Sequence, residues 1–295
     1  MTYKIFEVKS AIHYHKSRYA SNWDLNVYRG CEHRCVYCFA QYTHKYMDNK
    51  NFFNDIFVKK NIVQVLLQEL NKKNWNNNNV LCISGVCDCY QPCEEKYKLM
   101  QDILKILIKN KQSIYILTKS NLILRDYDLI AELSNVAKYV NIAMSIPTLN
   151  KDISSKIEPN VISGIERLKT LIEFTKIKNC RTTYMLLPII PYLTDKKLEL
   201  ENIFENISRY KIQNIIYGAL NMRGEVKTNF YSFLKKEFPD VLEKIQKLYK
   251  GSYVSKNYSI NLDKFCRYLT NKYNIKNNTL YEDDHDANKQ MEFKF

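Results

Sequence analysis

The sequence predicts an α/β fold, a partial (β/α)6 TIM-type barrel with a C-terminal helical extension. Two observations predict it. Between residues 25 and 217, short apolar runs alternate with segments whose apolar residues recur at helical spacing. After residue 221 the alternation stops and only helical spacing follows. Strands that alternate with helices of ten to fifteen residues pair in parallel through right-handed crossovers, and the six expected here form an open barrel.

Residues 1–24 are expected to form an N-terminal arm. They hold Phe6, Val8, Ile12 and Tyr14 among basic residues, with no firm periodicity. We expect this segment to be extended, or to form a short strand that lies against the barrel.

Residues 25–220 are expected to carry the barrel. The first helix should begin at Val58, because Val63, Leu66 and Leu70 fall on one helical face and Lys59 falls on the other. Later helices are expected at Tyr97–Leu107, Asp126–Leu133, Val161–Thr175 and Asp195–Ile207. The six expected strands are Leu25–Tyr28, Val80–Ile83, Ser113–Leu117, Tyr139–Met144, Arg181–Leu187 and Asn214–Tyr217.

Residues 221–276 are expected to form three helices that close the open side of the barrel. Their apolar positions include Phe230 and Leu234, then Ile245, then Leu269, and Pro239 separates the first two helices. Residues 277–295 are polar and without period, so this tail is expected to be disordered.

Composition indicates a basic protein of the reducing cytoplasm. The formal net charge is +14, which favours polyanionic partners such as nucleic acid, although solvated lysine faces are the ordinary source of such a charge. Nine cysteines without a signal peptide argue against a disulfide scaffold. No apolar run reaches membrane length, so we expect no membrane partner.

Cys31, Cys35 and Cys38 are separated by three and then two residues, just after the first expected strand. Thiolates are the natural ligands of a [4Fe–4S] cluster, and three of them leave one iron open for a substrate or cofactor. Cys-x3-Cys-x2-Cys is the motif of the radical S-adenosylmethionine (SAM) enzymes, whose open iron chelates SAM. The alternatives are a structural zinc knuckle, which usually recruits four ligands, and three unrelated buried thiols.

Polar or small residues follow four of the expected strands: Ser84-Gly85, Thr118-Lys119-Ser120, Ser145 and Pro188–Pro191. The carboxyl ends of parallel strands build the active site of βα barrels, so these residues are candidates for binding a cofactor. For the serines, the structural alternative is a helix cap or turn. Lys119 directly follows an apolar run, and a lysine in that place needs a partner such as the carboxylate of SAM.

The motifs resemble those of the radical SAM superfamily, in its spore photoproduct lyase-like branch, often labelled DNA repair photolyases. The resemblance runs from about Ser10 to Tyr273. It implies a partial (β/α)6 barrel, one SAM-binding [4Fe–4S] cluster, and a 5′-deoxyadenosyl radical that abstracts hydrogen from the substrate. It is carried by Asn26–Tyr46, Tyr90-Gln91-Pro92-x-Glu94, Leu117–Ser120, Ser145-Ile146-x-Thr148, Glu158-Pro159 and Pro188–Pro191.

Transferred by position, the resemblance implies that Cys31, Cys35 and Cys38 bind the cluster. It places Tyr37 beside the SAM adenine, and it gives Ser84, Lys119 and Ser145 contacts to SAM. Cys82 falls near the hydrogen-donating cysteine of the lyase, although a cysteine in an apolar strand is more often part of the core.

Two departures count against thymine-dimer repair. Phe39 replaces the relay tyrosine that follows the third cluster cysteine in the lyase, and a phenyl ring has no O–H to give. Cys87, Cys89 and Cys93 stand around a motif that usually reads Thr-Asp-Pro-Tyr-Gln-Pro. These thiols offer ligands for a second iron–sulfur cluster, with Cys180 or Cys82 as the fourth, or a hydrogen donor, or they are reduced passengers.

Three functional hypotheses follow. The first is a radical SAM enzyme acting on nucleic acid, and the second is a radical SAM enzyme that modifies a peptide or protein side chain. Both require an external one-electron reductant of the flavodoxin or ferredoxin type. The third is a non-catalytic iron–sulfur or zinc-dependent module that binds nucleic acid, which gives no reason for a full barrel.

Overall fold

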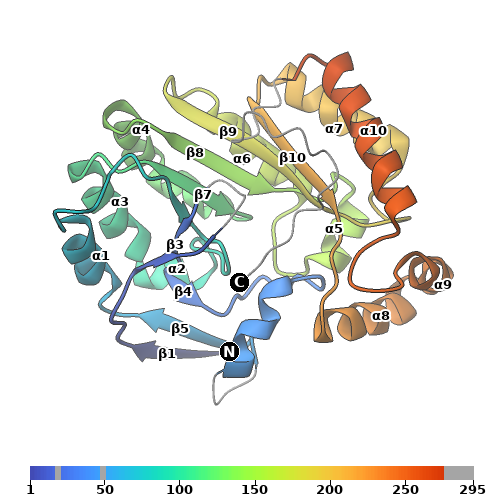
Figure 1. Ribbon diagram of the computed structural model, residues 1–295, viewed down its shortest axis with the longest axis horizontal. Helices are drawn as coiled ribbons and strands as arrows, with labels where there is room; N and C mark the ends of the chain where they lie inside the picture. Colours follow the sequence, from blue (N-terminus) through green and yellow to red (C-terminus); the bar gives the residue numbers. More distant parts are fainter. Residues whose placement is uncertain (17–20, 47–50, 276–295) are drawn as a thin grey trace.

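The computed structural model describes residues 1–16, 21–46 and 51–275. Figure 1 shows a curved sheet whose seven strands run in the order β10-β9-β8-β7-β6-β3-β2. Six of them pair in parallel, and β2 (Ile12–Tyr14) adds an antiparallel strand at one edge. The partial barrel predicted from the sequence is confirmed. The parallel strands are β3 (Trp23–Leu25), β6 (Leu81–Ile83), β7 (Ile114–Thr118), β8 (Val140–Ser145), β9 (Cys180–Ile189) and β10 (Asn214–Ala219).

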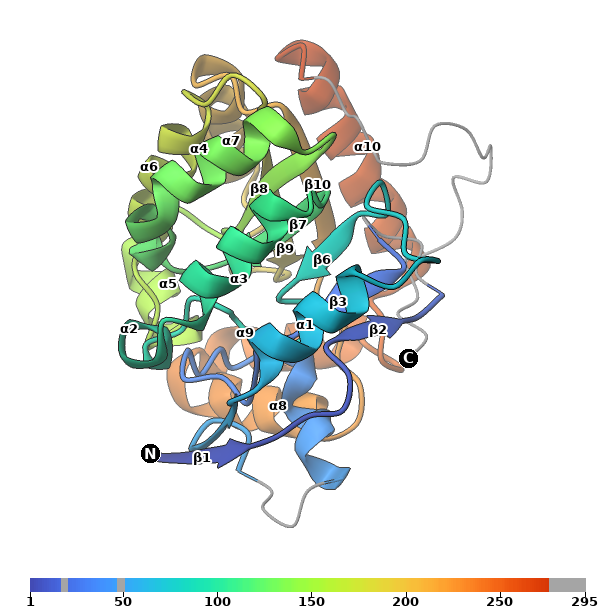
Figure 2. The same ribbon diagram turned by 90° about the vertical axis from the view of Figure 1, so that its left-hand side faces the viewer.

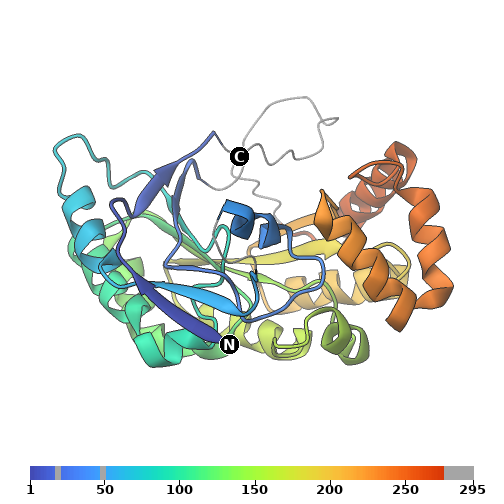
Figure 3. The ribbon, with the colours of Figure 1, turned by 90° about the horizontal axis from the view of Figure 1, so that it is seen from below.

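Helices cover one face of this sheet, as Figures 2 and 3 show. Their apolar sides pack on strand residues such as Ile116 and Ile142 in one buried core. The helices between successive strands are α1 (Ile62–Leu70), α3 (Leu99–Lys109), α4 (Tyr127–Val136), α6 (Gly164–Phe174) and α7 (Lys197–Arg209). Shorter elements are α2 (Cys93–Tyr97), α5 (Lys151–Ile157) and the 3-10 helices η1 (Phe39–Tyr46) and η2 (Asn121–Asp126).

The opposite face of the sheet carries a row of polar side chains. Asp24, Cys82, Tyr115 and Asn141 are register partners on four neighbouring strands. Because side chains alternate along a strand, this row points away from the helices that cover Ile116 and its neighbours. The carboxyl ends of all the parallel strands meet at one rim of the sheet, which brings their following loops together.

The first βα unit differs from the prediction. The expected strand Leu25–Tyr28 is divided, since β3 ends at Leu25 and Tyr28–Arg29 forms β4 in a second sheet. That sheet has the order β1-β5-β4, with β1 (Thr2–Phe6) parallel to β5 (Asp55–Lys59). The helix expected from Val58 begins at Ile62, because Val58 pairs with Ile5 in the small sheet. Local periodicity does not reveal such pairing between distant segments.

Two further helices begin later than predicted. The helix expected from Tyr97 begins at Leu99, because Lys98 has a left-handed φ of 50° and separates α2 from α3. The helix expected from Val161 begins at Gly164, after a capping box between Ser163 and Glu166. The short helix α5 before it was not predicted.

Three helices follow the barrel, as predicted: α8 (Glu225–Glu237), α9 (Pro239–Leu248) and α10 (Lys256–Lys272). Helix α10 packs on α7 and β10 at the open edge of the sheet, and α8 packs on η1 (Figure 1). Within the described ranges, no helix combines the length and apolar character needed to cross a membrane. The predicted tail at residues 277–295 lies outside the described residues.

Candidate active site

Cys31, Cys35 and Cys38 lie in the loop between β4 and η1, here called the cysteine loop (residues 30–38). Cys31 and Cys35 are buried and Cys38 is half-buried, and all three thiols are free. The structure therefore presents three reduced sulfur ligands on one short segment.

Backbone hydrogen bonds attach the cysteine loop to two other parts of the fold. The N–H of Cys31 donates to the carbonyl of Phe52 at 3.2 Å, and the N–H of Val36 donates to the carbonyl of Ile157 at 3.0 Å. Ile157 ends helix α5, which follows β8. The loop is thus fixed over the carboxyl ends of the strands, where βα barrels place their chemistry.

The chemistry of this donor set suits a bound metal centre. Burial raises the pKa of all three thiols, that of Cys38 to about 11, and the thiols raise one another's pKa further where Cys35 and Cys38 face Cys31. Three thiolates so close together need a neutralising cation, which the irons of a cluster supply.

No three His, Cys, Asp or Glu side chains of the described residues gather closely enough to hold a single metal ion. A structural zinc site requires four ligands around one ion at about 2.3 Å from each sulfur. The open spread of Cys31, Cys35 and Cys38 therefore fits a cluster of several irons better than the zinc knuckle considered above.

Lys119 connects the cysteine loop to the strand ends. It follows β7 directly, and its ammonium group lies 3.1 Å from the hydroxyl of Tyr37, 2.5 Å from the hydroxyl of Ser145 and 2.9 Å from Glu158. The hydroxyl of Tyr37 also donates to Glu158, and that of Ser145 donates to the carbonyl of Leu187 at 2.8 Å. Three predicted site residues, Tyr37, Lys119 and Ser145, are thus brought together.

Arg167 completes this network and was missed from the sequence. Its guanidinium group makes two bonds to the carboxylate of Glu158 and donates to the carbonyl of Ser145 at 2.5 Å. Both side chains of the Arg167–Glu158 pair are fully buried. A sequence signal existed, because Arg167 occupies the apolar stripe of α6 that continues at Leu171 and Phe174.

Burial alone would raise the pKa of the Glu158 carboxyl, but Arg167 and Lys119 more than offset it and lower this pKa to about 2. A depressed carboxyl pKa stabilises the fold above the ordinary value of 4.5, and this stability is lost as the pH falls from 4.5 towards 2. We expect Glu158 to contribute about 3 kcal/mol to the pH dependence of unfolding in that window.

Denaturant unfolding between pH 7 and pH 3 measures this contribution. E158Q should be less stable than the wild type at pH 7 and should lose less stability on acidification, because the amide does not titrate. Equal pH dependence in both proteins would contradict the assignment.

Ser84 and Asp88 organise the loop after β6. Ser84 has a φ of 78°, which is strained for a residue other than glycine, and its hydroxyl accepts the N–H of Cys89 at 2.8 Å. Asp88 accepts the hydroxyl of Thr118 and the N–H of Lys119, both at 2.7 Å. Ser84 is therefore part of the same rim as Lys119, although no contact joins their side chains directly.

His33 is a further residue that the sequence prediction left without a role. Its Nδ1 lies 3.4 Å from Asp88, and both side chains are buried. Burial lowers the pKa of the imidazole despite the nearby carboxylate. His33 stands between Cys31 and Cys35 in the motif, which was the available signal.

Cys82 lies deeper than the other predicted site residues. Its register partners are Asp24 and Tyr115, and its thiol hydrogen-bonds the Asp24 carboxyl group. Lys119 comes four residues after Tyr115 along the strand, a rise of about 13 Å at the usual spacing. The structure thus places Cys82 within the sheet, about one layer of side chains or more from the cysteine loop.

Cys87, Cys89 and Cys93 are buried and free, and each has its own hydrogen-bond partner. The partners are the Tyr28 carbonyl at 2.7 Å for Cys87, the Ser84 side chain for Cys89 and the Glu32 side chain for Cys93. Cys180 begins β9 at the opposite end of the sheet. This arrangement favours reduced thiols with protein partners, and the second cluster stays a prediction for iron analysis.

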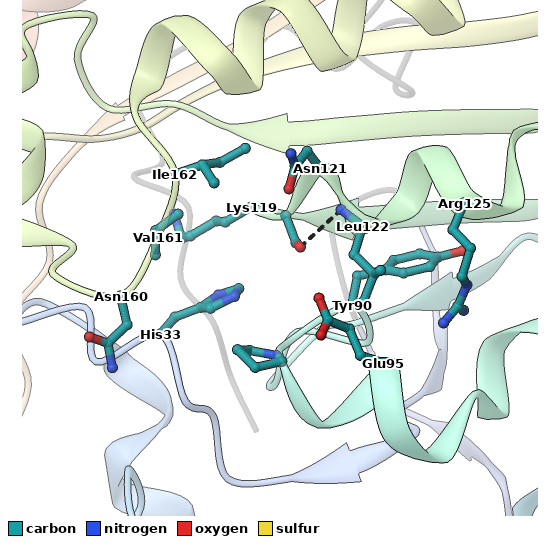
Figure 4. Close-up of a pocket in the computed structure, with 12 residues that line it drawn as sticks. His33, Tyr90, Glu95, Lys119, Asn121, Leu122, Arg125, Asn160, Val161 and Ile162 are labelled. Carbon is teal, nitrogen blue, oxygen red and sulfur yellow. Dashed lines mark hydrogen bonds between the residues drawn. The ribbon is translucent and has the colours of Figure 1, made fainter.

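A cavity of about 440 Å³ opens beside the cysteine loop (Figure 4). Its volume falls within the usual range for small-molecule sites. His33 and Lys119 line it together with residues of α2, η2 and the segment before α6. The remaining lining residues are Tyr90, Pro92, Glu95, Ser120, Asn121, Leu122, Arg125, Asn160, Val161 and Ile162.

A sequence model described as the radical SAM superfamily matches residues 25–227 of this chain. Among curated relatives, an uncharacterized protein of Mycobacterium tuberculosis is 30% identical over 260 residues, which cover 86% of this chain and 75% of that protein. The matched segment includes the cysteine loop and all the predicted site residues.

Two solved structures share the fold. Spore photoproduct lyase complexed with dinucleoside spore photoproduct matches with a TM-score of 0.68 and 12% identity, covering 92% of this chain and 79% of that chain. Streptococcus suis SuiB bound to the precursor peptide SuiA matches with a TM-score of 0.52 and 14% identity, covering 86% of this chain and 47% of that chain.

Proposed function

This chain belongs to the radical SAM superfamily, and we propose that it is an enzyme that abstracts hydrogen from a nucleic acid. Enzymes of this superfamily use a [4Fe–4S] cluster and SAM. The observation that carries the proposal is the cysteine loop fixed beside Lys119, Tyr37 and Ser145 at the carboxyl rim of a parallel sheet. The non-catalytic module considered from the sequence accounts for neither the rim nor the family.

In this proposal Cys31, Cys35 and Cys38 hold the cluster. When bound, the cluster supplies the electron that splits SAM and so starts radical chemistry at the substrate. The chain's own residues bind and orient the cofactor: the Lys119 ammonium suits a carboxylate, and the Tyr37 ring, fixed by its hydroxyl, offers a flat face for an adenine. Ser84 and Ser145 offer hydroxyl groups at the same rim.

The test is anaerobic reconstitution with iron and sulfide, followed by SAM and dithionite. The protein should then release 5′-deoxyadenosine, as measured by chromatography. Failure to bind iron, or iron binding without any 5′-deoxyadenosine, would contradict the proposal.

Two findings support nucleic acid as the substrate. The formal net charge of +14 favours contact with phosphates. The fold is also similar to a lyase whose solved complex contains a dinucleoside photoproduct. Neither finding distinguishes DNA from RNA.

If the substrate is nucleic acid, its binding should weaken steeply with salt. Each phosphate contact contributes about 0.9 to the slope of log affinity against log salt concentration on duplex DNA. We expect fluorescence anisotropy with labelled single-stranded and duplex oligonucleotides to show binding at 50 mM salt that falls at least about tenfold by 200 mM. Absence of binding at the lower salt concentration would remove this substrate class.

A peptide or protein substrate is the second candidate. The structural likeness to SuiB in complex with a precursor peptide favours it, and the extra thiols of Cys87, Cys89 and Cys93 would then be ligands of an auxiliary cluster. Iron and sulfide analysis separates the two. About four of each per chain indicates one cluster, whereas about eight indicates a second one.

The reaction requires an external one-electron reductant, for which we propose a flavodoxin or ferredoxin type of protein. We further propose a reducing cytoplasmic location. Its support is that all nine cysteines are free in the structure.

A further inference from the structure

The buried ion pair between Arg167 and Glu158 requires an explanation. Both side chains are fully shielded from solvent. Removing two charges from water is costly, and replacing such a pair by apolar residues is often neutral or stabilising. Stability alone is therefore a weak reason for an arginine in the apolar stripe of α6.

The pair lies directly against the cysteine loop. Glu158 accepts the hydroxyl of Tyr37, which stands between Cys35 and Cys38 in sequence. Cys35, Tyr37 and Ile157 also belong to one buried apolar cluster, and Ile157 immediately precedes Glu158. The charges of Arg167 and Glu158 thus act on the cysteine loop through one intervening side chain, in surroundings that exclude water.

Resting on the proposed function, we propose that Arg167 and Glu158 set the reduction potential of the cluster held by the cysteine loop. They are positioning residues, since they also hold the Lys119 ammonium and the Tyr37 ring in place without touching the substrate. A cluster that gains an electron becomes more negative. A buried positive charge nearby favours that state and a buried negative charge opposes it, because the low dielectric screens them weakly.

Other charged groups share this region. Lys119 adds a second cation beside Glu158 at 2.9 Å, and Asp88 adds an anion that faces His33 at 3.4 Å. The proposal therefore concerns the change in potential when one charge is removed, and not the absolute potential, to which all of these groups contribute.

Two substitutions separate charge from geometry. E158Q and R167M break the same ion pair, yet E158Q removes a negative charge and R167M removes a positive one. Redox titration of the reconstituted cluster without SAM, followed by absorbance or electron paramagnetic resonance, should show a higher potential in E158Q and a lower one in R167M. We expect each shift to change the ratio of reduced to oxidised cluster about tenfold at fixed solution potential, ~59 mV for one electron.

Three further variants complete the test. The double variant E158Q/R167M should return close to the wild-type potential, and R167K, which keeps the charge, should stay near it. R209M is the control for net charge, because Arg209 pairs with Glu205 on the exposed surface of α7 and its removal should leave the potential unchanged. If R167M does not fold, K119M removes a cation from the half-buried edge of the same network and should also lower the potential.

Shifts of the same sign in E158Q and R167M, or no shift in either, would overturn the inference, because loosened packing alone does not distinguish the sign of the lost charge. Failure of the wild type to bind iron would instead contradict the proposed function. The two failures are therefore distinguishable in the same preparation.

Discussion

Replacing Cys35 with alanine should abolish the release of 5′-deoxyadenosine from SAM. Only three thiols of the cysteine loop are available to the cluster, and a thiolate ligand has no substitute in the methyl group of alanine. We expect C35A to lose both bound iron and SAM cleavage, down to the level measured without protein. Iron analysis and chromatography of 5′-deoxyadenosine on the same anaerobic sample check both.

Cys266 provides the matched control. It is a free, fully buried cysteine on α10, outside the cysteine loop and the rim residues. C266A should keep its iron and its SAM cleavage, with a modest loss of stability from the small cavity. Cleavage that persists in C35A, or that disappears equally in both variants, would count against the assignment of the cysteine loop.

The sequence was sufficient where chemistry and local pattern coincide. The three cysteines, Lys119 and Ser145 each follow an apolar strand, and the rule that parallel strands end at one rim predicts their proximity. The structure agrees, since Lys119 lies 2.5 Å from Ser145. The six parallel strands follow from the same alternation of local periods.

Long-range pairing is what the sequence did not reveal. Val58 belongs to a helical period by local spacing, yet it pairs with Ile5, more than fifty residues away. Arg167 likewise needed knowledge of Glu158 on the preceding segment before its burial could be understood. In each case a partner decides the structure, and a local window contains only one of the two partners.

Cys82 shows how register changes a functional prediction. Alignment by motif places it near the hydrogen-donating position of the lyase, whereas its pairing with Asp24 and Tyr115 places it within the sheet, below the strand ends. Its role as a hydrogen donor stays a prediction. The register requires a substrate or radical that reaches past Lys119 into the barrel.

The second large effect is expected at Gly30, which begins the cysteine loop. Gly30 has a φ of +85°, and a Cβ added there would lie 2.5 Å from the carbonyl oxygen of Asp55 and 3.0 Å from that of Phe52. Both oxygens belong to the backbone, so neither can move as a flexible side chain would. G30A should therefore shift Cys31, the next residue, away from its position beside Cys35.

We expect G30A to lose most of its iron and to unfold with a free energy lower by about 1–3 kcal/mol, the usual range for a residue forced into a left-handed backbone. G251A is the control, because nothing lies within 4 Å of a Cβ at Gly251. That variant should keep its iron, with stability within about 0.5 kcal/mol of the wild type. Iron retention in G30A equal to that in G251A would mean that Cys31 tolerates displacement, and the cluster would then depend less on the backbone of this loop than its contacts indicate.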